Sequence, residues 1–133
     1  MRKLIAVLPV AAVAAFALVA IGAGAAGGQG TAHSAKTTTL RLKASPSGAF
    51  RFDRKKLSAS HGKVTIVMTN PSSSGLTHGI AVEGKGVDKD GPKVRPGKKS
   101  TLTVTLKKKG KYTFYCPVDG HRSMGMRGTL TIH

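Results

Sequence analysis

The sequence predicts an all-β domain, a Greek-key sandwich or barrel of two sheets with about seven to eight strands. Short segments in which apolar and polar residues alternate recur through most of the chain, and such alternation is typical of half-buried strands. Gly, Pro, Asn and Ser separate these segments, and these residues favour turns. The length of 133 residues allows one domain, and no internal repeat is evident.

The expected strands follow one another in the order of the alternating segments. In residues 63–69, Val64, Ile66 and Met68 fall on one face, and residues 101–106 repeat this pattern. A further apolar strand begins near His78, and a short helical turn fits residues 53–60. The alternating segments are residues 38–42, 49–52, 63–69, 101–106, 111–115 and 128–132.

Residues 1–26 are predicted to be a secretory signal peptide. Arg2 and Lys3 precede an uncharged stretch rich in Ala, Val, Leu and Gly that ends in small residues, as is typical of such signals. The alternative is an uncleaved membrane anchor, because about 20 apolar residues are enough to cross a bilayer. Either way, the rest of the chain is expected to lie outside the cytoplasm. Residues 27–37 are predicted to be a flexible linker, and residues 38–133 the folded domain.

The part of the chain that follows the signal segment is strongly basic. It carries 20 Lys and Arg against five acids, a net charge of +15 with His neutral. Such a field favours acidic proteins, anionic membranes or cell-wall polymers as partners. Nucleic acid is not expected, because no basic helix is visible and aromatic residues are few. The alternative for the basic clusters at residues 54–56, 98–99 and 107–109 is solubility and protection of strand edges.

The candidate chemistry lies between the last two expected strands. From Cys116 to Met126 the chain brings together a thiol, the imidazole of His121 and two thioethers. Cys116 is the only cysteine, so an exported chain has no internal disulfide to form. Thiolate, imidazole and thioether form a soft ligand set that suits copper. A trigonal site of two His and one Cys needs a second His from elsewhere.

Four other histidines could supply that ligand. His78 stands at the start of an apolar strand, where a ring at a strand end can reach another loop. His61 is expected in a turn beside a glycine, His33 lies in the predicted linker, and His133 is the last residue of the sequence. His78 is therefore the favoured second ligand.

The sequence at this point resembles the plastocyanin and azurin family of blue copper proteins, the cupredoxins. The resemblance covers nearly the whole chain from Thr38 onward. An ordered set of one His, followed by Cys, His and Met on the last loop, is more specific than any one of these residues. The matching features are the segment from Gly62 to Asn70, the isolated His78, the segment from Gly110 to Cys116, the Cys116-x4-His121-x4-Met126 loop, and residues 128–132.

The resemblance implies one type 1 copper ion as cofactor. It makes His78, Cys116 and His121 the strong ligands and Met126 the axial one. Met124 is close enough in sequence to compete for the axial position, but plastocyanin-like members place their methionine five residues after the histidine.

One position departs from the family pattern. Related proteins commonly follow the first histidine with Asn, whose side chain braces the loop that carries the cysteine. This chain has Gly79 there. Because outer-shell groups tune a metal, the rigidity of the site then depends on other residues.

The function implied is that of an exported electron carrier, not an enzyme. A fixed ligand set lets copper change oxidation state with little movement, and His121, at a loop tip, is expected to be the partly exposed ring through which the electron leaves. Protein redox partners with an acidic docking surface and a monomeric state are expected. The alternative is a copper protein for storage, delivery or resistance. Multicopper oxidases and copper nitrite reductases need further copper sites, and a binuclear copper A centre needs two cysteines.

Overall fold

A computed structural model describes residues 36–133 of the chain. The predicted signal segment, His33 and most of the predicted linker lie outside the described residues. Within residues 36–133, no helix is long and apolar enough to span a bilayer.

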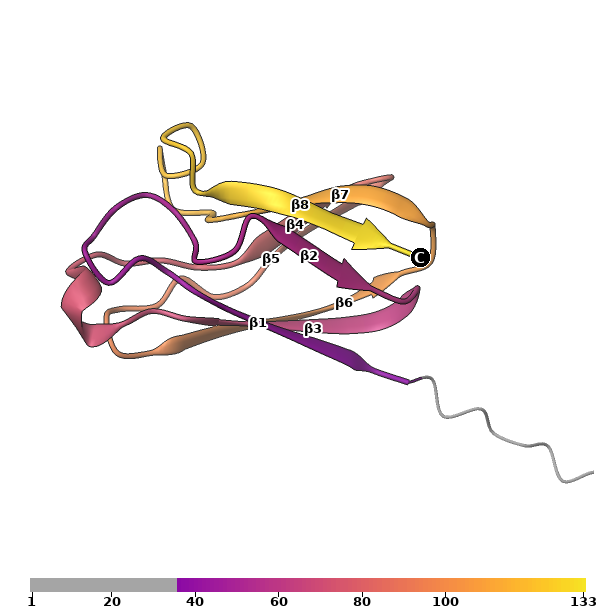
Figure 1. The fold of residues 1–133 in the computed structure, drawn as a ribbon, viewed down its shortest axis with the longest axis horizontal. Helices are drawn as coiled ribbons and strands as arrows, with labels where there is room; N and C mark the ends of the chain where they lie inside the picture. Colours follow the sequence, from indigo (N-terminus) through magenta and orange to yellow (C-terminus); the bar gives the residue numbers. More distant parts are fainter. Residues whose placement is uncertain (1–35) are drawn as a thin grey trace, which may run out of the picture. The chain divides into compact units, whose positions relative to one another are not determined.

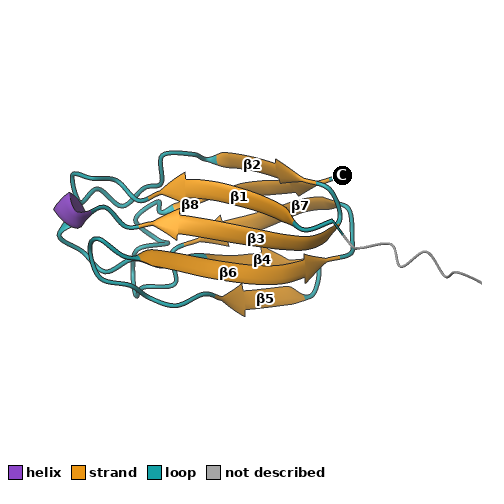
Figure 2. Ribbon diagram, turned by 90° about the horizontal axis from the view of Figure 1, so that it is seen from below, coloured by secondary structure: helices purple, strands orange, loops and turns teal. Residues whose placement is uncertain are grey.

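The described residues form two β-sheets packed face to face, with one short 3-10 helix (Figures 1 and 2). One sheet has the order β1-β3-β6 and the other β2-β8-β7-β4-β5, so that successive strands repeatedly change sheet. This confirms the predicted all-β Greek-key sandwich. The elements are β1 (Thr38–Lys43), β2 (Lys56–Ala59), β3 (Gly62–Thr69), η1 (Ser72–Ser74), β4 (Ala81–Gly84), β5 (Val87–Asp90), β6 (Lys99–Leu106), β7 (Gly110–Tyr115) and β8 (Arg127–Ile132).

The core lies between the inner faces of the two sheets. β3 pairs with β1 in parallel and with β6 in the antiparallel direction, and Val64, Ile66 and Met68 are fully buried on its inner face. On the opposite sheet, Phe114 of β7 and Leu130 of β8 are also fully buried. The alternation that predicted these strands therefore marks the face that each one buries.

Two expectations for residues 49–60 are wrong. Residues 49–52 form no strand, and only Phe52 makes an isolated bridge, to Ala44. The helical turn expected at residues 53–60 is absent, and β2 occupies most of this segment and pairs in parallel with β8. Leu57 is buried in β2 while Lys56 is exposed, so burial at the sheet edge determines the local structure.

β5 was not predicted at all. It contains one apolar residue, Val87, and three charged ones, and it is the edge strand that pairs only with β4. An edge strand with mostly exposed side chains needs little alternation, because charge on an edge protects it from pairing with other chains.

The segments that carry the candidate chemistry meet at one end of the sandwich. β7 ends at Tyr115, β8 begins at Arg127, and β4 begins at Ala81. The loop between β7 and β8 and the segment before β4 therefore emerge at the same end of the five-stranded sheet, where Figure 1 shows the loop in orange and yellow.

Candidate metal centre

The backbone around His78 is held from two sides. The N–H of His78 donates to the carbonyl of Val94 at 3.1 Å, and the N–H of Val94 donates back at 2.7 Å. Asn70, which is fully buried, donates from its side-chain amide to the carbonyls of Leu76 and Val94 at 2.8 and 3.0 Å. The hydroxyl of Ser74 donates to Asn70 Oδ1 at 2.6 Å. Asn70 thus links the segments on both sides of His78, and sequence reasoning did not assign it a role.

The loop from Cys116 to Met126 is closed by its own backbone. The N–H of Cys116 donates to the carbonyl of Met126 at 3.0 Å, and the N–H of Met126 donates to the carbonyl of His121 at 3.0 Å. Gly120, which precedes His121, has a φ of 77°, a left-handed conformation that glycine adopts without steric cost. The loop is therefore a compact turn that places three candidate ligands close together.

Three of the predicted ligands converge below the surface. Sγ of Cys116 lies 3.5 Å from Nδ1 of His121 and 3.9 Å from Nδ1 of His78. One potential ligand atom from each of the three residues lies within 4.8 Å of the others. With metal–ligand distances of about 2.0–2.3 Å, as at zinc sites, donor atoms around one ion lie about 3.3–4 Å apart. The spacing around the sulfur therefore fits a shared ion.

The two methionines of the loop differ in burial. Met126 is fully buried, whereas the side chain of Met124 is 54% exposed. Only Met126 therefore lies on the inner side of the loop, where a thioether can complete a soft ligand set.

Burial favours the metal-binding form of the two histidines but disfavours that of the cysteine. Burial lowers the pKa of His78, and nearby His121 lowers it further. Burial also lowers the pKa of His121, so both rings stay neutral, as metal binding requires. Burial raises the pKa of the Cys116 thiol, while backbone hydrogen bonds from Val118 and Gly79 oppose that change. A bound cation would stabilise the thiolate that burial disfavours.

Gly79 is explained by its close packing against Pro117. A Cβ at position 79 would lie 3.2 Å from both Cγ and Cδ of Pro117 and 3.1 Å from the carbonyl oxygen of Pro92. The N–H of Gly79 donates to Sγ of Cys116 at 3.4 Å. A larger residue at position 79 would thus crowd the residue that follows the cysteine.

His121 is less exposed than the sequence suggested. Its exposed fraction is 8%, against 0% for His78, so the expectation of a partly exposed ring is wrong. The ring of Phe50 covers it, with 4.8 Å between the ring centroids. Sequence reasoning missed Phe50 because it lies 71 positions before His121 and no local signal connects the two.

The remaining described histidines lie away from this cluster. His61 Nδ1 lies 3.1 Å from the O atom of His133, and His133 Nε2 lies 2.8 Å from the hydroxyl of Ser58. His61 precedes β3 and His133 follows β8, at the end of the sandwich opposite the β7–β8 loop. Their exclusion as ligands agrees with the geometry.

Comparison with known proteins identifies the kind of domain. A family model described as copper binding proteins, plastocyanin/azurin family, matches residues 39–133. A search of curated protein sequences found no match.

Solved structures match the fold at low sequence identity. Auracyanin B is 20% identical, with a TM-score of 0.65 over 75% of this chain and 91% of that one. Auracyanin A, a "blue" copper protein from Chloroflexus aurantiacus, is 19% identical, with a TM-score of 0.60 over 74% and 100%. A copper nitrite reductase from Nitrosomonas europaea is 23% identical, with a TM-score of 0.61 over 73% of this chain but only 41% of that one. The fold thus occurs both in a small blue copper protein and within a larger enzyme.

Proposed function

The chain belongs to the plastocyanin/azurin family of copper-binding proteins, and we propose that it carries single electrons between redox partners outside the cytoplasm. The observation that carries the proposal is the buried cluster of Cys116 Sγ with Nδ1 of His78 and His121. Copper bound there would supply the Cu(I)/Cu(II) couple. The two oxidation states prefer different ligand sets, and a site that suits neither fully does not hold copper in one of them.

The proposed ligands are His78, Cys116 and His121, with Met126 in the axial position. All four side chains are buried and come from the segment before β4 and the β7–β8 loop. Backbone hydrogen bonds hold the first and the last of these positions. A ligand set held in this way moves little when charge changes, which favours electron transfer over chemistry that needs an open metal position.

Burial of the cluster supports a carrier more than an enzyme. His78 and Cys116 are at most 1% exposed, so a substrate has no direct route to the candidate metal position through them. Among the described residues, the metal-ligating cluster contains no carboxylate, and the acid nearest in the loop, Asp119, is exposed. A general base beside the metal is therefore lacking in this part of the chain.

The electron route proposed here uses the edge of His121. It is the more exposed of the two rings, and Phe50 packs on it. We assign Phe50 the role of excluding water from His121 while leaving a short path from the ring to the surface.

The proposal includes the chain's organisation and location. Residues 1–26 would direct export or anchor the protein, residues 27–37 would act as a linker, and residues 38–133 would form a monomeric copper domain. The support is the charge and apolar pattern of the first residues.

A visible absorption spectrum of the protein with one equivalent of Cu(II), before and after ascorbate, tests the proposal. We expect an intense blue thiolate-to-copper band that bleaches on reduction and returns on oxidation. Cys116→Ser should lose the band and keep the far-UV circular dichroism of the sandwich, whereas the control Met124→Leu should keep both. A colourless complex would contradict the proposed site, and copper that passes rapidly to a chelator would favour storage or delivery.

A further inference from the structure

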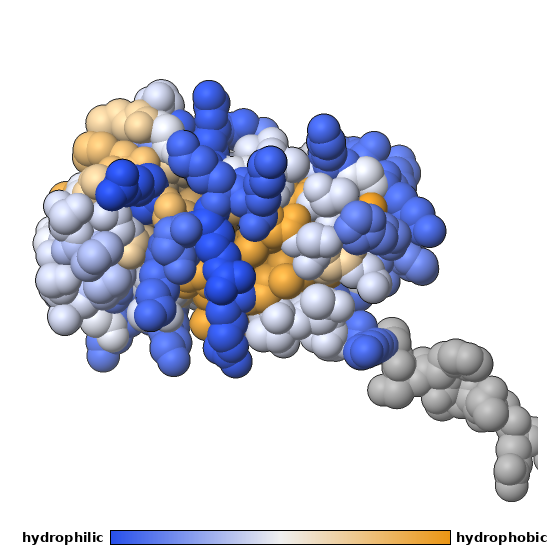
Figure 3. All heavy atoms as spheres, in the orientation of Figure 1, coloured by the Kyte–Doolittle hydropathy of each residue, from blue (hydrophilic) through white to orange (hydrophobic). Residues whose placement is uncertain are grey.

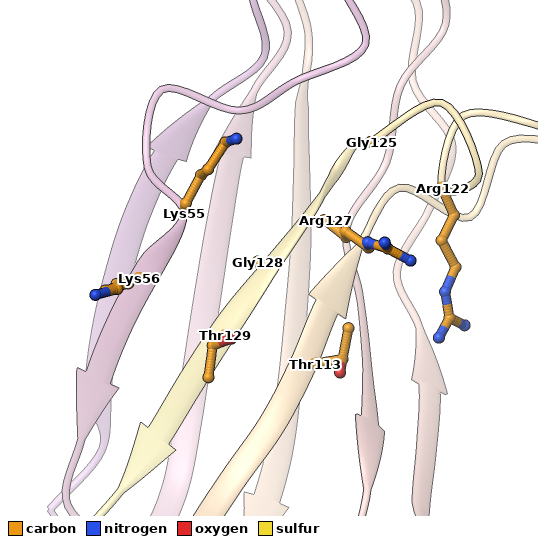
Figure 4. Close-up of a pocket in the computed structure, with 8 residues that line it drawn as sticks. All are labelled: Lys55, Lys56, Thr113, Arg122, Gly125, Arg127, Gly128 and Thr129. Atoms are coloured by element: carbon orange, nitrogen blue, oxygen red, sulfur yellow. The ribbon is translucent and has the colours of Figure 1, made fainter.

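A basic pocket lies on the outer face of the five-stranded sheet, beside the candidate metal loop. It has a volume of about 560 Å³. Four of its eight lining residues are cationic, and none is acidic. Figure 4 shows Lys55 and Lys56 on the β2 side of this pocket, with Arg127 and Arg122 at the other side. We call these four residues the β2–β8 basic patch.

The strand register extends this observation across the whole outer face. Lys56 of β2 pairs with Thr129 of β8, which pairs with Thr113 of β7. Continuing in the same row, Thr113 pairs with Glu83 of β4, and Glu83 with Asp88 of β5. The face therefore changes from basic at β2 to acidic at β5.

The acidic half contains most of the acids of the domain. Glu83, Asp88 and Asp90 lie on β4 and β5, and they are three of the five acids in the entire sequence. Arg122 joins the two halves, because it forms an ion pair with Glu83 and stacks over the ring of Tyr115 at 4.3 Å from its centroid.

The other three cations of the patch are available to a partner. Lys55, Lys56 and Arg127 are exposed, and within residues 36–133 none of them forms an ion pair, since the one found joins Arg122 to Glu83. Figure 3, drawn in the orientation of Figure 1, shows hydrophilic side chains projecting from most of the visible face. Exposed charges of this kind attract an oppositely charged partner over a distance and speed its association.

The patch is directly connected to the candidate metal loop. Arg122 follows His121 in the chain, and Gly125 and Arg127, which line the pocket, are the neighbours of Met126. The main chain of Lys55 also joins β8, because its carbonyl accepts a hydrogen bond from the N–H of Thr129 at 2.8 Å. A molecule held in the pocket would therefore lie next to the chain neighbours of two proposed ligands, His121 and Met126.

We propose that the β2–β8 basic patch docks the carboxylates of an acidic protein redox partner, and that the acidic β4–β5 hairpin repels that partner and so fixes its orientation. The inference rests on the proposed electron-carrier function and assigns the partner's contact surface. Docking on this side places the partner against the flank of the β7–β8 loop, with its acidic residues turned away from Asp88 and Asp90.

Three other occupants fit the observations less well. A small anion needs a site with buried donors, whereas Lys55, Lys56 and Arg127 are exposed. A second copy would bring together two domains that each carry a net charge of +14, from 19 Lys and Arg against five acids in residues 38–133, and this repulsion outweighs the few acids at β4 and β5. Anionic lipids attract a broad basic surface. A membrane lying on this face would also meet the acids of β4 and β5, which its anionic lipids would repel.

The test uses poly-L-glutamate as an acidic polypeptide probe of the copper-loaded, reduced protein. Binding is followed by the backbone amide NMR shifts at low ionic strength. Neutralising the patch with Lys55→Gln, Lys56→Gln and Arg127→Gln should weaken binding roughly tenfold or more, because nearby charges dominate association. The matched control, Lys107→Gln, Lys108→Gln and Lys109→Gln, removes the same charge from the far end of β7 and should weaken binding about threefold or less. Asp88→Asn should strengthen binding.

The outcomes separate the docking proposal from the function on which it rests. Both triple variants should retain the blue band and its bleaching by ascorbate. Absence of the band from the wild-type protein would contradict the proposed electron-carrier function, whereas the binding results test the docking proposal. Shifts centred on Lys56 and Thr129 that only the patch variant abolishes would support docking. Equal weakening by the two triple variants would overturn it, because net charge alone would then explain binding. Preferential binding to phosphatidylglycerol vesicles, or equally tight binding of inorganic phosphate, would overturn it as well.

Discussion

Replacing Gly79 with alanine should destabilise the metal-free protein, although the same change at an open position would stabilise it. The added Cβ would lie 3.1–3.2 Å from three atoms, two of which belong to Pro117. The optimum separation of carbon atoms is about 3.5–4.0 Å, so the neighbours must move by several tenths of an ångström. Overpacking of this kind costs about 1–3 kcal/mol.

The net effect combines this cost with a gain through the unfolded chain. Gly79 does not have a positive φ, so alanine can adopt its backbone conformation and should restrict the unfolded state by about 0.4–1 kcal/mol. Taken at the middle of both ranges, the difference is a loss of roughly 1.3 kcal/mol, within limits of about 0 and 2.6 kcal/mol. For a domain of this size, each kcal/mol lowers the Tm by about 4–8 °C. Thermal unfolding followed by circular dichroism should therefore show a Tm lower by about 5–10 °C.

A double-mutant cycle with Pro117→Ala isolates the contact. Pro117→Ala removes both carbon atoms that crowd position 79, so Gly79→Ala should cost less in that background. We expect a coupling free energy of about 0.5–2 kcal/mol, in the range measured for residues in contact. Equal stabilisation by Gly79→Ala in both backgrounds would refute the reasoning, because crowding by Pro117 would then be absent. Since Pro117 follows Cys116, the single variant should also shift the absorption of the copper-loaded protein.

Three further predictions concern the ligands and their supports. Met126→Leu should change the reduction potential measured by redox titration far more than Met124→Leu, because only Met126 is buried; equal changes would contradict the axial assignment. Asn70→Ala should lower the free energy of unfolding, measured in denaturant, by about 2–4 kcal/mol, since it leaves buried hydrogen-bonding groups without partners. A loss below about 0.5 kcal/mol would contradict this, because it would mean that water satisfies those groups. In the metal-free protein, the lowered pKa values of His78 and His121 mean that the unfolded chain binds protons first, so stability should fall as the pH drops through 6.5. His78→Gln should flatten that dependence, and an unchanged slope would contradict the assignment.

The sequence predicted the strands whose inner faces are buried. In β3, Val64, Ile66 and Met68 alternate with half-exposed residues. This alternation is local, so it can be read from the sequence even when the partner strands are not known. Residues 49–52 show the same alternation, but only Phe52 is fully enclosed in the core, while Phe50 is half-buried at its edge and packs on His121. Alternation thus indicates which side chains can be buried, and the tertiary structure decides what covers them.

The ligand types were predictable because three of the four lie within eleven residues of one another. The residues that support the ligands were not predictable, because their contacts join segments that are distant in the chain. Phe50 packs on His121, Asn70 donates to the carbonyl of Val94, and Pro117 crowds Gly79. The exposure of His121 was misjudged for the same reason, since the covering ring comes from the segment after β1.

The structure separates the residues that set the metal site from those proposed to choose the partner. The candidate ligands are fixed from inside, by Asn70 through Val94 and by the backbone bonds that close the β7–β8 loop. Lys55, Lys56 and Arg127 of the β2–β8 basic patch are exposed on the outer face of the five-stranded sheet. Substitutions among those exposed charges leave the internal hydrogen bonds intact, so partner choice can change while the metal environment stays constant. Arg122 is the exception, because it stands next to His121 and pairs with Glu83, and a change there should affect docking and the site together.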